Sequence, residues 1–173
     1  TLAARFPEAP EYRHALAGVR SDAGELLAES GDAREAQEAF ERALLERRDL
    51  AARFPERIAY QVGVVESSRL LADFLRRTGR QKEAEQGYRT ALDYAAQRAG
   101  GFQQAVATRR CLAGVRYGLA ALLTDLDRLA EAQAALQEAI ASRAKLAADF
   151  PYVPRYEHDL AMTHVALGDV ALR

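Results

Sequence analysis

The dipeptide Phe-Pro recurs at a fixed interval along this chain. It occurs at Phe6-Pro7, Phe54-Pro55 and Phe150-Pro151, so the first two copies lie 48 residues apart and the last two lie 96 residues apart. Halfway between the last two stands Phe102, although Gln103 takes the place of the proline. A 48-residue period therefore fits the whole sequence without insertion or deletion. Such self-similarity predicts structural units that stack on one another.

The period divides residues 1–173, which we interpret as one repeat domain, into three complete units and part of a fourth. The units cover residues 2–49, 50–97, 98–145 and 146–173. Alanine, leucine, arginine and glutamate, all good helix formers, dominate the composition. No alternating Val/Ile/Thr segment bounded by turn residues is present. The sequence therefore predicts an all-α fold.

Each unit is expected to contain two helices, which gives about seven in the whole chain. The first helix of a unit begins just after the Phe-Pro pair, because proline suits an early helical position. Apolar residues such as Tyr60, Val64, Leu71 and Leu75 then recur at intervals that keep one face of this helix inward. We expect these first helices at about residues 9–29, 57–77, 104–125 and 153–172.

A turn of a few residues separates the two helices of a unit and makes them antiparallel neighbours. Gly31 and Gly79 suit the left-handed conformation that closes a helix, and Asp127 is a poorer substitute in the third turn. The second helix of each unit carries a larger residue between two alanines, which lets helix backbones approach closely. These triplets are Ala36, Phe40 and Ala43, then Ala84, Tyr88 and Ala91, and finally Ala132, Leu136 and Ala139.

The array Gly24, Gly31, Ala36, Phe40 and Ala43 resembles the tetratricopeptide repeat (TPR), and the resemblance recurs in register in the next two units. It implies a right-handed α-solenoid of stacked antiparallel helix pairs. Each unit here exceeds the usual repeat of about 34 residues. The long unit with its Phe-Pro linker is similar to repeats of bacterial multidomain proteins, including regions that follow serine/threonine kinase domains.

Motifs for catalysis, cofactors or metals are not found. The sequence has no phosphate-binding glycine loop, no H-E-x-x-H and no G-x-S-x-G. His158 and His164 lie six residues apart, a spacing that does not align two metal ligands on one helical face. Cys111 aligns with mostly small residues of the other units, which favours a close helix contact over a nucleophile. We therefore expect no enzymatic activity, no cofactor and no metal.

Charge, hydropathy and cysteine content narrow the choice of partner and location. The formal net charge is −1, which selects neither nucleic acid nor an acidic membrane. No run of 18 or more apolar residues and no signal peptide are visible, so we expect no membrane partner. A single cysteine fits a reducing compartment, and a cytoplasmic location is the expectation.

The TPR resemblance implies a concave groove, lined by the first helix of each unit, that binds a protein or peptide. Our primary interpretation is therefore a non-enzymatic interaction scaffold. The alternative is a regulatory or sensory region of a larger signalling enzyme, such as a bacterial serine/threonine kinase. Carrying the groove positions over one by one gives Ser21, Glu25, Glu29, Glu66, Arg69, Asp73, Arg76, Arg77, Tyr117, Ala121, Thr124 and Asp125, with Val165 and Asp169 in the fourth unit.

Charge is distributed unevenly along the units. The first unit has seven basic and eleven acidic residues, the second has eight and six, the third seven and four, and the partial fourth two and four. A basic middle favours an acidic or phosphorylated peptide, because guanidinium groups match carboxylates and phosphates. The alternative is that these arginines only solubilise the surface. Uncovered terminal helices leave a homodimer open as well. The basic middle contains Arg69, Arg76, Arg77, Arg109, Arg110 and Arg116.

Overall fold

The structure, a computed structural model, describes residues 9–98 and 100–173, and its regular secondary structure in these ranges is entirely helical. The prediction of an all-α fold is confirmed. Phe6, the first of the repeated phenylalanines, lies outside the described residues. The helices are α2 (Pro10–Ser30), α3 (Ala33–Arg53), α4 (Ile58–Arg77), α5 (Gln81–Ala96), α6 (Gly101–Gln104), α7 (Val106–Asp125), α8 (Leu129–Asp149) and α9 (Pro154–Ala171).

The helix starts follow the 48-residue spacing. The helices α2, α4, α7 and α9 begin at residues 10, 58, 106 and 154, and α3, α5 and α8 begin at residues 33, 81 and 129. The expected starts of the first helices agree with these to within two residues. The short helix α6 was not predicted, so the described part has eight helices instead of about seven. It forms in the linker that lacks proline, after Gly100 has turned the chain with a φ of 71°.

The turns between paired helices adopt the expected left-handed conformation. Gly31 has a φ of 91°, Gly79 a φ of 80° and Asp127 a φ of 58°. Because a side chain crowds the backbone in this region, the two glycines adopt it without strain and Asp127 does not. The backbone amide of Gly31 donates to the carbonyl oxygen of Leu27, which closes α2.

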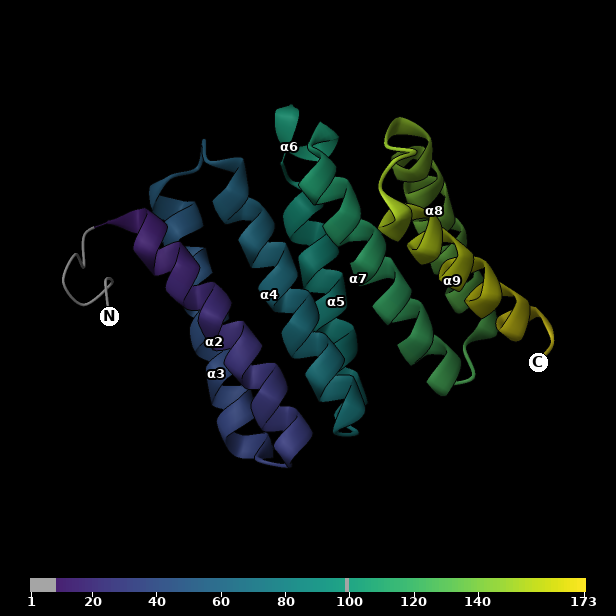
Figure 1. The fold of residues 1–173 in the computed structure, drawn as a ribbon. Helices are drawn as coiled ribbons and strands as arrows, with labels where there is room; N and C mark the ends of the chain where they lie inside the picture. Colours follow the sequence, from purple (N-terminus) through teal and green to yellow (C-terminus); the bar gives the residue numbers. More distant parts are fainter. Residues whose placement is uncertain (1–8, 99) are drawn as a thin grey trace.

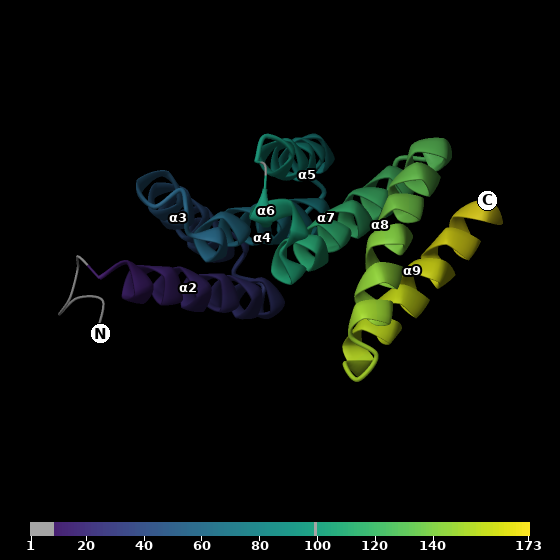
Figure 2. The ribbon, with the colours of Figure 1, turned by 90° about the horizontal axis from the view of Figure 1, so that it is seen from above.

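The helices form two layers. Figures 1 and 2 show α2, α4, α7 and α9 side by side in one layer, with α3, α5 and α8 in the other. Every long helix packs against the one that follows it in the chain, except that α5 is followed by α6 and packs on α7. Within the first layer, α4 also contacts α2 and α7. The pairs α2–α3 and α8–α9 occupy the two ends of the array (Figure 1).

The core lies between the layers, where the predicted triplets of the second helices meet the first helices. Phe40, Tyr88 and Leu136 are each almost fully buried, and so are the alanines on either side of them. A Cβ atom built on Gly24 would lie only 3.0 Å from the ring of Phe40, so a small residue is needed there. Close backbone approach around one large side chain per unit therefore holds each helix pair together.

Linker aromatics pack against tyrosines at the start of the next helix. The ring centroids of Phe54 and Tyr60 are 5.9 Å apart in an edge-on arrangement, and the same distance separates Phe150 from Tyr156. Phe102 is buried in the main apolar cluster. These contacts fit a structural role for the linkers, in which an aromatic pair fixes the entry of each first helix.

Candidate functional site

A hollow of about 410 Å³ runs along the first layer. It receives side chains from α2, α4, α7 and α9, and one from α8, so it runs across all the units. We call it the inner groove. Its lining residues are Glu25, Glu66, Arg69, Asp73, Arg76, Arg77, Arg110, Cys111, Gly114, Tyr117, Gly118, Ala121, Arg143, Arg155 and Asp159.

Eight of the twelve residues assigned to the groove from the sequence line this hollow. They are Glu25, Glu66, Arg69, Asp73, Arg76, Arg77, Tyr117 and Ala121.

The other four lie elsewhere. Ser21 is buried and its hydroxyl donates to the carbonyl oxygen of Ala17, so it offers no surface to a partner. Glu29 is exposed near the end of α2, outside the hollow. Thr124 and Asp125 line a separate hollow of about 180 Å³ between α7 and α9.

Much of the groove wall is held by internal charge pairs. Arg69 pairs with Asp73 one turn further along α4, at 2.5 Å, and the phenol of Tyr88 donates to the other oxygen of Asp73. Burial, reinforced by the charge of Asp73, raises the pKa of Tyr88, so its proton remains available for this bond. Arg76 reaches across to Asp125 of α7 at 2.8 Å. These contacts fix α4 relative to α5 and α7.

Arg143 enters the groove from the second layer, and reasoning from the first helices missed it. Its guanidinium donates to the carbonyl oxygen of Asp159 at 2.6 Å and to the hydroxyl of Thr163, and it lies 5.0 Å from the ring centre of Tyr117. Burial lowers the pKa of Arg143. The signal in the sequence was its position two periods, or 96 residues, after Arg47.

Two groove arginines carry exposed charge without an ion pair among the described residues. Arg77 lies in the last turn of α4, and Arg110 lies in the first half of α7. By contrast, Arg109 is paired with Asp149 at 2.8 Å, and Arg116 is paired with Glu138 at 2.7 Å. The basic middle predicted from the sequence therefore divides into paired arginines and two that remain available to a ligand.

The groove contains one thiol, Cys111, and the described residues form no metal-binding cluster. Burial raises the pKa of the Cys111 thiol, which favours the unreactive protonated form. Residues 9–98 and 100–173 contain no group of three or more His, Cys, Asp or Glu side chains placed to hold a metal ion. In the same ranges, no helix combines the length and apolar character needed to cross a bilayer.

Comparison with other proteins bears on the fold alone. No family model matches the chain, and no curated protein matches it in sequence. Among solved structures, it is similar to BtubC (BKLC) from P. vanneervenii, with a TM-score of 0.67 and 20% sequence identity. The superposition covers 95% of this chain and 75% of that one. The similarity supports the all-helical arrangement described above.

Proposed function

We propose that this chain is a protein-binding scaffold, a right-handed α-solenoid of TPR-like units whose inner groove binds an acidic peptide segment. The observation that carries the proposal is the pair of exposed, unpaired arginines, Arg77 and Arg110, within a hollow that crosses every unit. The lining contains six arginines and four carboxylates, so the groove is basic although the chain as a whole is slightly acidic.

The arginines in internal ion pairs hold the groove wall in place, and the two without such a pair bind the acidic ligand. Arg69 and Arg76 are engaged with Asp73 and Asp125, so a ligand gains little by competing for them. Arg77 and Arg110 present guanidinium groups that can donate hydrogen bonds to a ligand carboxylate without breaking an internal ion pair. The ring of Tyr117 also lines the groove and offers an apolar surface to the peptide chain.

Binding of a fluorescein-labelled peptide rich in Asp and Glu, followed by fluorescence anisotropy, tests the proposal. We expect saturable binding that weakens as salt increases, and a loss of about tenfold or more when Arg77 and Arg110 are both changed to alanine. The double change Arg48→Ala and Arg57→Ala is the matched control, because both arginines are exposed and lie outside the groove.

Equal loss of affinity in both double variants would mean that only overall charge matters and would overturn the proposal. Failure of the acidic peptide to bind the unmodified chain would also overturn the proposal. A phosphorylated version of a serine-containing probe forms the second arm, since phosphate and carboxylate share the same guanidinium chemistry.

A further inference from the structure

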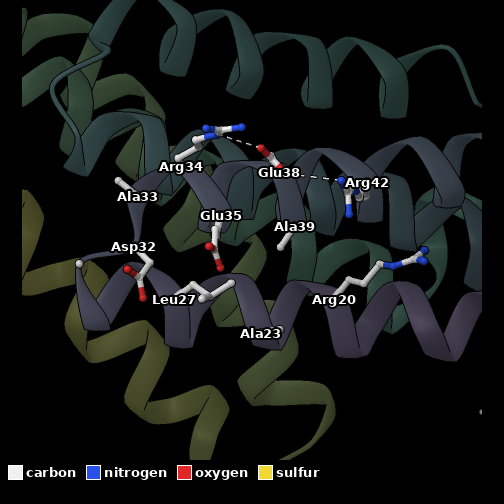
Figure 3. A pocket seen from close by; sticks show the side chains of 11 residues that line it. Arg20, Ala23, Leu27, Asp32, Ala33, Arg34, Glu35, Glu38, Ala39 and Arg42 are labelled. Carbon is white, nitrogen blue, oxygen red and sulfur yellow. Dashed lines mark hydrogen bonds and ion pairs between the residues drawn. The ribbon is translucent and has the colours of Figure 1, made fainter.

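A second hollow lies on α2 and α3, at one end of the array. It has a volume of about 820 Å³, and Figure 3 shows its lining side chains, which come from α2, the following turn and the first half of α3, with the remaining helices behind them. Leu27 and Ala23 form part of its apolar floor, and Arg34, Glu38 and Arg42 form a chain of ion pairs along one wall. This surface is separate from the inner groove.

The same hollow occurs one period further along, where a helix covers it. Eight of the eleven lining positions, shifted by 48 residues, line a hollow of about 290 Å³ on α4 and α5. There α3 lies over the hollow and contributes Gln37, Glu41, Leu44 and Arg48 to its lining. The open hollow on α2 and α3 therefore has a form that accepts one more helix.

Two apolar side chains of α2 mark the uncovered face. Val19 is 62% exposed and Leu26 is 67% exposed. The equivalent residues of the other first helices are buried: Ser67, Val115 and Thr163 are 1, 0 and 0% exposed, and Phe74, Leu122 and Val170 are 3, 0 and 5% exposed.

The residue that faces Val19 can be inferred from the covered copies. Arg47 donates to the hydroxyl of Ser67 at 3.0 Å, and Arg143 makes the same bond to Thr163. In the intervening unit, Ala95 occupies the arginine position, and it is buried in the same apolar cluster as Val115. Where the first helix carries a hydroxyl residue, the covering helix carries arginine, and where the first helix carries valine, the covering helix carries alanine. Val19 therefore matches a small apolar residue, as on α5, because an arginine there would lack the hydroxyl acceptor that Ser67 and Thr163 provide.

The charge of a helix that would bind this face can be inferred in the same way. Arg80 donates to the side chain of Gln37 at 2.6 Å, and Arg128 pairs with Glu85 at 2.8 Å. Gln37 and Glu85 are equivalent residues of the covering helices. On the open face, Asp32 stands where Arg80 and Arg128 stand, and Glu35 also lines the hollow. The complementary residue on an incoming helix is therefore basic.

We propose that the face formed by α2 and α3 binds an amphipathic helix of a partner protein. This helix resembles α5 in presenting small apolar residues to Val19 and Leu26, and it differs from α5 in carrying lysine or arginine opposite Asp32 and Glu35. The charge complementarity and the two covered copies of this face, on α4–α5 and α7–α8, support a helical occupant.

The test uses a synthetic peptide with the α5 sequence, residues 80–97, held helical by a lactam bridge on its outward face. It is made both unmodified and with Glu85→Lys, and isothermal titration calorimetry measures binding to the 173-residue chain. We expect the Glu85→Lys peptide to bind about tenfold tighter than the unmodified one. In the Asp32→Arg chain, which reproduces the charge of Arg80 and Arg128, this preference should reverse.

Leu26→Glu should abolish binding of both peptides, whereas Leu45→Glu should not. Leu45 is a matched control because it is 71% exposed and its equivalents Asp93 and Ala141 are also exposed, so this position is not covered in any unit. Absence of binding, or a peptide preference that Asp32→Arg does not reverse, would overturn the proposal. A molar mass near twice 19.0 kDa that Leu26→Glu halves would also overturn it, by assigning the face to a second copy.

Discussion

Arg47 is the most informative single residue to change, because the chain contains its own comparison. The side chain is buried between α3 and α4, where it donates to the carbonyl oxygen of Gly63 at 3.1 Å and to the hydroxyl of Ser67 at 3.0 Å. It also lies 3.3 Å from a carboxylate oxygen of Glu66. One period later, Ala95 and Val115 stand in place of Arg47 and Ser67. The chain therefore tolerates a polar and an apolar version of the same helix junction.

We expect Arg47→Ala to lower the free energy of unfolding by about 2–3 kcal/mol. A hydrogen bond from a charged group to a buried acceptor contributes roughly 1.5–3 kcal/mol, and loss of the packed stem adds a cavity. The loss stays moderate because the Ser67 hydroxyl can turn to the Gly63 carbonyl oxygen, as Ser21 bonds to Ala17. Glu66 is half-exposed and can be solvated, so no buried charge is left alone.

Ser67→Val alone should cost about 1 kcal/mol, since it removes one acceptor from a buried guanidinium. The double variant recreates the Ala95–Val115 junction and should lose only about 1–2 kcal/mol, less than the sum of the single changes. Urea unfolding followed by circular dichroism at several wavelengths measures all four chains and tests for two-state behaviour. Strictly additive losses would refute the view that the hydroxyl and the arginine form one unit.

Three further predictions follow from local geometry. Gly118→Ala should destabilise the fold by about 1–3 kcal/mol in thermal unfolding, because its Cβ would lie 2.8 Å from a ring carbon of Tyr88, whereas Gly168→Ala, with open space around it, should not. Asp127→Gly should raise the free energy of unfolding and Gly79→Ala should lower it, each by roughly 1 kcal/mol and each visible as a shift of the thermal midpoint, since both residues have positive φ and only glycine adopts it freely. Burial, aided by the charge of Arg47, lowers the pKa of His14, so the unfolded chain binds this proton more tightly and stability should fall as the pH drops below about 6.5. His14→Asn should reduce that pH dependence in urea titrations at pH 7.5 and 5.5.

The groove illustrates how far the sequence alone could reach. Helical periodicity identified the faces of α4 and α7, because residues three and four apart share a face whatever the surroundings. It could not show that Arg76 is engaged with Asp125, 49 residues away, or that Arg143 enters from the other layer. Those contacts depend on the register and tilt with which whole helices pack. Arg77 and Arg110 therefore emerged as the available charges only once the helices were in place.

The sequence by itself determined the helical class, the 48-residue spacing of the helix starts and the left-handed turns at Gly31, Gly79 and Asp127. These features are local: they follow from side-chain periodicity and from the backbone freedom of a few residues. The tertiary structure decided which charges are neutralised, that Arg47 is buried, and that Val19 and Leu26 remain uncovered while their equivalents do not. Burial is a property of neighbours distant in the chain, and equivalent positions differ in exposure because their neighbours differ.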